Sequence, residues 1–96
     1  MYLLNVSYTA LPENVLLHSE SHSAWVKKYF DNGTFLFAGP KKSKLGGAIL
    51  AKSIDKKLLM KILSEDSYVK NDVVEYHITD FDCKLLSPEL QYLSGC

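Results

Sequence analysis

The sequence predicts an α+β fold in which four antiparallel strands form one sheet and two helices cover one of its faces. Apolar and polar side chains alternate along residues 2–8 and 74–78, as they do in half-buried strands. Apolar side chains recur at helical spacing along residues 14–31 and 58–63. These segments follow one another in the order β-α-β-β-α-β, which is the order of the ferredoxin-like plait.

The chain begins with a strand that is followed by a long helix. Even-numbered side chains of residues 2–8 are apolar or aromatic, whereas the odd-numbered ones include Asn5 and Ser7. Pro12 or Glu13 can open the helix, because proline suits a first turn and an acidic side chain there complements the helix dipole. Asn32-Gly33 supplies a left-handed stop, so we expect one helix to run through residues 14–31.

The remaining elements are predicted from similar signals. An aromatic-rich run that ends at Gly39-Pro40 predicts the second strand, and the apolar run after Gly46-Gly47 predicts the third. The polar residues 53–55 can cap the second helix. We expect the fourth strand over residues 73–81 and one or two further helical turns after Pro88.

The length of 96 residues predicts a single domain with a thin core. Two helices on one face leave the other face of an antiparallel sheet without cover. A second copy that packs sheet against sheet would supply this cover, so we expect a homodimer.

Charge and cysteine content exclude several function classes. Eleven lysines balance eleven carboxylates and the chain has no arginine, which argues against a nucleic-acid-binding protein. Cys83 and Cys96 show no zinc-type spacing, so we expect no metal and no other cofactor. The first residues form neither a signal peptide nor a membrane span, so we expect a cytoplasmic protein without membrane contact.

The stretch HSESHSAW, residues 18–25, contains the most informative polar residues. His18 and His22 lie four residues apart and would share one face of a helix, but Glu20 would lie on its far side and no third ligand is evident. A metal site is therefore disfavoured. His22 falls on the apolar stripe that continues through Trp25, a position where most histidines are structural.

Several short segments, taken in order along the chain, carry a family resemblance. They are His22, Gly33, Ala38-Gly39-Pro40, Gly46-Gly47, Asp66-Ser67-Tyr68 and the strand 74–81. In this order and spacing, residues 2–84 resemble the YCII-related (YciI-like) family. Ser67 departs from the family pattern, which has proline at this position. Residues 85–96 form a C-terminal extension to which the resemblance assigns no role.

The resemblance implies a dimeric α+β barrel, in which two plaits pack sheet against sheet. It also implies a pocket where the helix histidine meets the aspartate that follows the second helix, here His22 and Asp66. One branch of the family performs a dehydrochlorination, and most members have no assigned reaction. The side chains and backbone expected to bind a small-molecule ligand beside this pair are those of Asn5, Ser7, Trp25, Gly39, Pro40 and Tyr68.

A histidine-aspartate dyad is suited to general acid-base chemistry. A carboxylate bound to one imidazole nitrogen fixes the tautomer and makes the other nitrogen a better base. We therefore expect an elimination or isomerisation of a small cyclic or aromatic-derived acid or enol, with His22 and Asp66 as the catalytic residues.

Two alternatives stay open beside the enzyme. In the first, His22 and Asp66 form a buried structural hydrogen bond in a non-catalytic dimeric binding module. In the second, the chain is an oxygenase of the same architecture. This is disfavoured because the pocket histidine would then come from the second helix, where this chain has no histidine.

Overall fold

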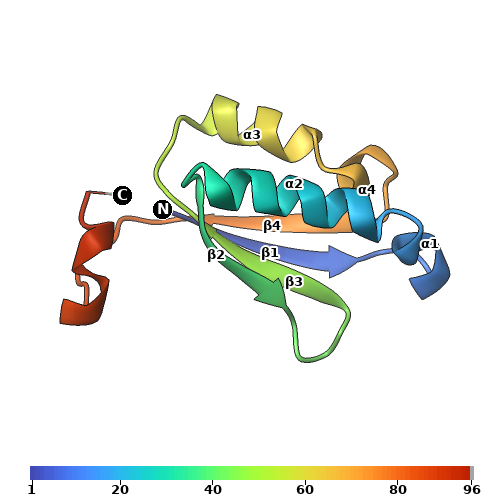
Figure 1. Ribbon diagram of the computed structural model, residues 1–96, viewed down its shortest axis with the longest axis horizontal. Coiled ribbons are helices and arrows are strands. Elements are labelled where there is room, and N and C mark those ends of the chain that lie inside the picture. The colour runs from blue at the N-terminus through green and yellow to red at the C-terminus, as the bar shows by residue number, and fades with distance from the viewer. Residues whose placement is uncertain (96) are drawn as a thin grey trace.

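The computed structural model describes residues 1–95 and has an α+β architecture with a single antiparallel sheet (Figure 1). Its elements are β1 (Tyr2–Tyr8), α1 (Pro12–Leu16), α2 (Ser19–Asp31), β2 (Phe35–Pro40), β3 (Gly46–Ala51), α3 (Lys56–Ser64), α4 (Ser67–Lys70), β4 (Val74–Asp80) and the 3-10 helix η1 (Pro88–Leu93). The predicted α+β class and the four antiparallel strands are confirmed.

The four strands form a sheet in the order β2-β3-β1-β4, with β2 and β4 at its edges. Every neighbouring pair is antiparallel, and β1 pairs with both β3 and β4 along its length. This arrangement is consistent with the expected plait. Helices α2 and α3 lie on the same face of the sheet, and no helix within residues 1–95 covers the other face (Figure 1).

The hydrophobic core lies between this face of the sheet and the two long helices. The alternation predicted for β1 decides which side chains enter it, because Tyr2, Leu4 and Val6 are buried while Leu3 and Asn5 are exposed. Trp25 of α2 and Leu59 of α3 close the core from the helical side. The indole N–H of Trp25 donates a hydrogen bond of 3.0 Å to the carbonyl of Ile62, which ties α2 to α3.

The single helix predicted for residues 14–31 is wrong, because the chain forms α1 and α2 with a turn at residues 17–18 between them. His18 is the residue that precedes α2, and its φ of −114° and ψ of 7° are not helical. The His18 carbonyl at this turn accepts a hydrogen bond of 3.1 Å from the Ser67 hydroxyl of α4. This contact with a distant part of the chain accompanies the break, and the residues around it, between Val15 and Trp25, include none that is buried.

The second half of the chain adds one element that the sequence did not predict. A four-residue helix, α4, follows α3 and begins after Asp66, whose carboxylate caps it by accepting a hydrogen bond from the Tyr68 N–H. Asp55, one of the residues predicted to cap the second helix, directly precedes α3, but its side chain makes no capping hydrogen bond. The helical turns expected after Pro88 are observed as η1.

The C-terminal segment extends past the end of the sheet, close to the start of the chain (Figure 1). Cys83 is half-buried and forms no disulfide within the described residues, and Cys96 lies outside them. Over residues 1–95, no helix has the length and apolar character that crossing a membrane requires.

Gly46, at the start of β3, allows β3 and β1 to approach each other closely. A Cβ added to Gly46 would lie 1.9 Å from the carbonyl oxygen of Val6, and the φ of 153° there disfavours any L side chain. Gly39 on β2 differs, because an added Cβ would meet nothing within 4 Å. The two glycines offer a matched pair of substitutions.

We expect Gly46→Ala to lower the free energy of unfolding by about 2 kcal/mol, since the backbone must move to relieve the overlap. For a domain of this size that loss corresponds to a decrease in Tm of about 10 °C. Gly39→Ala should leave Tm within about 2 °C of the parent protein. Thermal denaturation followed by circular dichroism measures both, and equal Tm values for the two variants would contradict the assigned close approach.

Candidate functional site

The site is centred on a hydrogen bond between His22 of α2 and Asp66, which immediately precedes α4. The His22 Nδ1 and Asp66 Oδ1 atoms are 2.7 Å apart. The Asp66 side chain is fully buried, whereas the His22 side chain is 19% exposed. One member of the pair is therefore shielded from water and the other is accessible.

Asp66 accepts hydrogen bonds through both of its carboxylate oxygens. Besides His22, Oδ1 accepts the backbone N–H of Tyr68 at 3.0 Å, and Oδ2 accepts the hydroxyl of Tyr76 at 2.8 Å. Each donor comes from a different element: α2, α4 and β4. A buried carboxylate is costly unless it is hydrogen-bonded, and these donors offset the cost.

Tyr68 also fixes the imidazole ring of His22 from one side. The two rings are stacked, with centroids 3.9 Å apart and an interplanar angle of 9°. Tyr68 is buried, and the Tyr8 ring packs against it in a T-shaped arrangement with ring centroids 5.9 Å apart. The stack and the bond to Asp66 together restrict both the position and the rotation of the imidazole.

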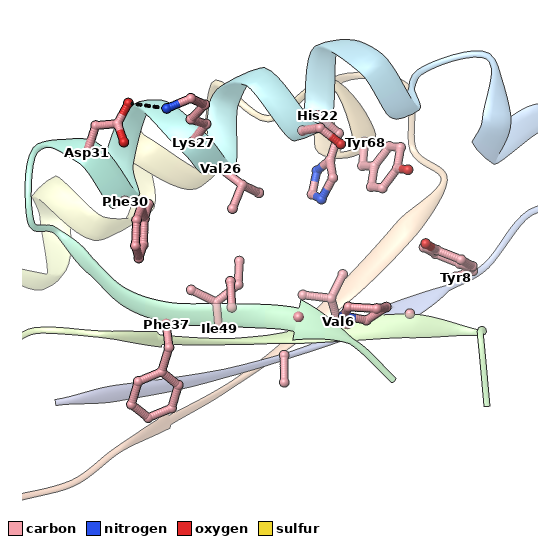
Figure 2. Close-up of a pocket in the computed structure, with 17 residues that line it drawn as sticks. Val6, Tyr8, His22, Val26, Lys27, Phe30, Asp31, Phe37, Ile49 and Tyr68 are labelled. Carbon is pink, nitrogen blue, oxygen red and sulfur yellow. Dashed lines mark hydrogen bonds and ion pairs between the residues drawn. The ribbon is translucent and has the colours of Figure 1, made fainter. Parts of the chain in front are cut away.

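The imidazole lines a pocket of about 710 Å³ between α2 and the sheet. Figure 2 shows His22, Val26 and Phe30 pointing from α2 toward the sheet, with Val6 and Ile49 facing them from the strands. Residues 38–40 of β2 and 46–48 of β3 complete the wall. The pocket is thus mainly apolar, with the imidazole as a polar group on its helical wall.

The charged groups at the pocket wall neutralise each other. Lys27 Nζ lies 2.8 Å from Asp31 Oδ2 one turn further along α2, and both side chains are largely exposed (Figure 2). Their ion pair leaves little net charge for a ligand to meet. A small, flat and mostly apolar molecule with one polar group fits this lining.

Two tyrosines around Asp66 stay protonated well above neutral pH. Burial, followed by the neighbouring Tyr8 hydroxyl and the Asp66 carboxylate, raises the pKa of Tyr68 to about 12. Burial, followed by the charge of Asp66 and the hydrogen bond to it, raises the pKa of Tyr76 far above its usual value. At neutral pH the Tyr76 hydroxyl is therefore a hydrogen-bond donor to Asp66.

The structure places the predicted ligand-binding residues in three different surroundings. Gly39, Pro40 and Tyr68 line the pocket beside His22. Trp25 does not line it, because its ring is buried in the core and its N–H is bound to Ile62.

Asn5 and Ser7 lie on the opposite face of the sheet. Asn5 is exposed there, and the Ser7 hydroxyl accepts a hydrogen bond of 3.1 Å from Lys41 Nζ. Neither is among the residues that line the pocket of His22. That they face the interior of a barrel stays a prediction.

Sequence reasoning missed Tyr76, which contacts Asp66 directly. A signal for it was available in the strand register, because Tyr76 pairs with Val6, and the side chains of paired residues share one face of the sheet. Placing β4 beside β1 in this register turns Tyr76 toward the helices. Without the strand order, its alternation with Val74 and Ile78 did not reveal the face.

His18 and His22 do not act as a pair in this structure. His18 lies in the turn before α2, and its carbonyl accepts hydrogen bonds from Ser21 and Ser67 hydroxyls. Within residues 1–95, no three histidine, cysteine or acidic side chains come together in a set that could hold a metal ion.

A scan against protein-family models and a search of curated proteins found no match to this chain.

The raised pKa values predict a late tyrosine titration and a loss of stability in alkali. The hydrogen bond to Glu65, followed by burial, raises the pKa of Tyr29 to about 12, which equals the value for Tyr68. Both tyrosines titrate near 10 in the unfolded chain, so the folded state holds their protons more tightly. Their contribution to stability is complete below about pH 10 and falls as the pH rises toward 12.

Absorbance at 295 nm during an alkaline titration measures this directly. We expect Tyr68→Phe to remove one tyrosine from the late phase near pH 12 in the folded protein, and one from the phase near pH 10 in urea. Tyr29→Phe should do the same. Loss of an early-titrating tyrosine from the folded protein would contradict the burial assigned to that ring.

Proposed function

We propose that the protein is an enzyme of the YciI-like type, in which His22 removes a proton from a small cyclic or aromatic-derived substrate. Asp66 assists His22, and the reaction is of the elimination or isomerisation class. The observation that carries this proposal is the asymmetry of the pair: a fully buried carboxylate holds Nδ1 of an imidazole that itself borders an open pocket.

The geometry supports an imidazole that, in its neutral form, carries its proton on Nδ1. A carboxylate acceptor at 2.7 Å favours the proton on Nδ1 and leaves the Nε2 lone pair for a ligand in the pocket. When Nε2 takes a proton, the charge of Asp66 stabilises the imidazolium that forms. The stack with Tyr68 keeps the ring in place during this transfer.

The pocket offers complementary groups for the rest of a small substrate. Val6, Val26 and Ile49 provide apolar walls for a ring, and the glycines at positions 39, 46 and 47 let the backbone approach closely. Negative charge that develops on an oxygen would need a hydrogen-bond donor, and the backbone near these glycines is the candidate source.

The uncovered face of the sheet supports the dimeric part of the proposal. The strand register places Leu3 beside Leu50 and Asn5 beside Ala48 on this face. Leu3 is 43% exposed in the single chain. A second copy that packs its own sheet here would bury these side chains, as in a dimeric α+β barrel.

A specific observation also favours the second candidate, a non-catalytic binding module. The hydrogen bonds of Asp66 connect α2, α4 and β4, which is what a structural linkage would do. The two candidates differ in what the exposed side of His22 does. A purely structural pair has no use for the pocket that the imidazole borders.

Deuterium exchange into candidate ligands tests the catalytic proposal without knowledge of the complete reaction. In D₂O, the protein should exchange carbon-bound protons of a small cyclic keto acid or enol from a screening panel, as measured by mass spectrometry. We expect His22→Ala to lower the exchange rate by about 100-fold or more, which is typical for loss of a general base. His18→Ala is the matched control and should keep the parent rate.

The folded state of the variants must be checked in the same samples. His22→Ala leaves two donors on Asp66, so its circular dichroism spectrum should match that of the parent protein. A folded His22→Ala variant that exchanges as fast as the parent protein would exclude His22 as the base. Absence of exchange across the panel, with ligand binding retained, would favour the binding module.

The dimer is tested by substitutions that place a charge on either face of the chain. We expect Leu3→Lys to convert a dimer into a monomer in sedimentation equilibrium, because a buried unpaired ammonium is costly. Leu58→Lys on α3 is the control, since Leu58 has a similar exposed fraction of 47% but lies on the helical side. A monomeric parent protein, or equal masses for both variants, would contradict sheet-to-sheet packing.

A further inference from the structure

The carboxylate of Asp66 has a third partner whose role the proposed function does not assign. Tyr76 of β4 donates its hydroxyl to Oδ2 at 2.8 Å, whereas His22 and the Tyr68 N–H both bind Oδ1. Among the described residues, Tyr76 is thus the only hydrogen-bond donor to Oδ2 from a side chain or from the backbone. Since Asp66 is fully buried, water does not replace this donor.

We propose that Tyr76 is a positioning residue of the site, which acts on His22 through Asp66. Its hydroxyl keeps the carboxylate ionised and turned toward the imidazole, and it thereby sets how strongly the pair holds a proton. This inference rests on the proposed function, because it assigns a purpose to the charge on Asp66.

The contacts run from Tyr76 of β4 to Asp66, from Asp66 to His22, and from His22 to the pocket. The phenol of Tyr76 withdraws electron density from Oδ2, and so reduces the negative charge that Oδ1 presents to His22. Removal of the hydroxyl leaves more charge on the carboxylate in a site without water, and the pair responds by taking up a proton more readily. The pair should then titrate at a higher pH.

Few other ionisable groups border the pair and compete with this effect. Tyr68 of α4 is stacked on the imidazole, and Tyr8 of β1 contacts the Tyr68 ring. Lys27 and Asp31 of α2 pair with each other at the pocket wall. Glu65 is adjacent to Asp66 in the sequence, but its carboxylate binds the Tyr29 hydroxyl and lies near Lys28.

Tyr29 therefore provides a matched control for Tyr76. Both tyrosines donate a hydroxyl to a carboxylate, and both link a long element to the α3–α4 region, but the partner of Tyr29 is not bound to His22. Tyr29→Phe and Tyr76→Phe remove the same atom and the same type of bond. Only the second change should reach the imidazole.

The test is a nitrogen-15 NMR titration of the His22 ring, which requires neither substrate nor activity. We expect Tyr76→Phe to raise the midpoint of the titration by about 0.5 pH unit relative to the parent protein. Tyr29→Phe should leave the midpoint unchanged. Replacement of Tyr76 by 3-fluorotyrosine, whose hydroxyl is a stronger donor, should lower the midpoint and keeps the fold even if Tyr76→Phe does not.

Failure of this inference can be distinguished from failure of the proposed function. An unchanged midpoint in both Tyr76 variants, together with a midpoint lowered by Asp66→Asn, would overturn the role of Tyr76 and leave the dyad in place. An unchanged midpoint in Asp66→Asn as well would overturn both, because Asp66 would then have no influence on His22. Opposite shifts for phenylalanine and 3-fluorotyrosine at position 76 would support the role of Tyr76.

Discussion

The arrangement of the molecule depends on one buried negative charge. A carboxylate without access to water is tolerated only when hydrogen-bond donors replace the water, and Asp66 obtains them from α2, α4 and β4. These three elements must therefore meet at one point. The same requirement places His22 against the carboxylate, so the geometry of the candidate site follows from the way in which the chain compensates this charge.

The pocket exists because two neighbouring strands carry almost no side-chain volume where α2 passes over them. Pro40 of β2 lies opposite Gly47 of β3, Gly39 lies opposite Ala48, and Gly46 lies close to the backbone of β1. Gly47 pairs with Val6, whose side chain is buried on the helical face, so a larger residue at position 47 would take up space on the pocket side. The hollow is thus encoded by small residues on the sheet, and its chemistry is encoded by one histidine on the helix.

Strands β1 and β4 could be predicted from the alternation in the sequence because each one covers the core with a single face. Val6 and Leu4 alternate with exposed neighbours, and this alternation is a direct consequence of a sheet with one covered side. The break between α1 and α2 could not be predicted in the same way, since the stretch 16–24 is compatible with a helix and the contact at the break, from the Ser67 hydroxyl to the His18 carbonyl, joins residues 49 positions apart. The four residues of α4 are too few for any periodicity to show.

The contact between His22 and Asp66 was inferred from a resemblance, because it joins residues 44 positions apart. Periodicity assigns each residue to a face of its own element, but it does not determine which elements meet. Tyr76 illustrates the limit, since its position on the helical face becomes evident only when β4 is paired with β1. Long-range hydrogen bonds around a buried charge are therefore the part of this site that local sequence patterns do not specify.

The pocket and the uncovered face lie on opposite sides of the sheet. The proposed proton transfer and the proposed dimer therefore involve different sides of the sheet. His22 and Tyr68 reach the pocket from the helical side, so a second copy on the other side would not cover the imidazole (Figure 2). Phe37 of the edge strand β2 borders both sides of the sheet, because it lines the pocket rim while its ring points away from α2. A partner packed against the sheet would contact this ring and would influence the pocket through β2. The proposed proton transfer at His22 would therefore need only the single chain, whereas the proposed partner would contact the pocket rim at Phe37.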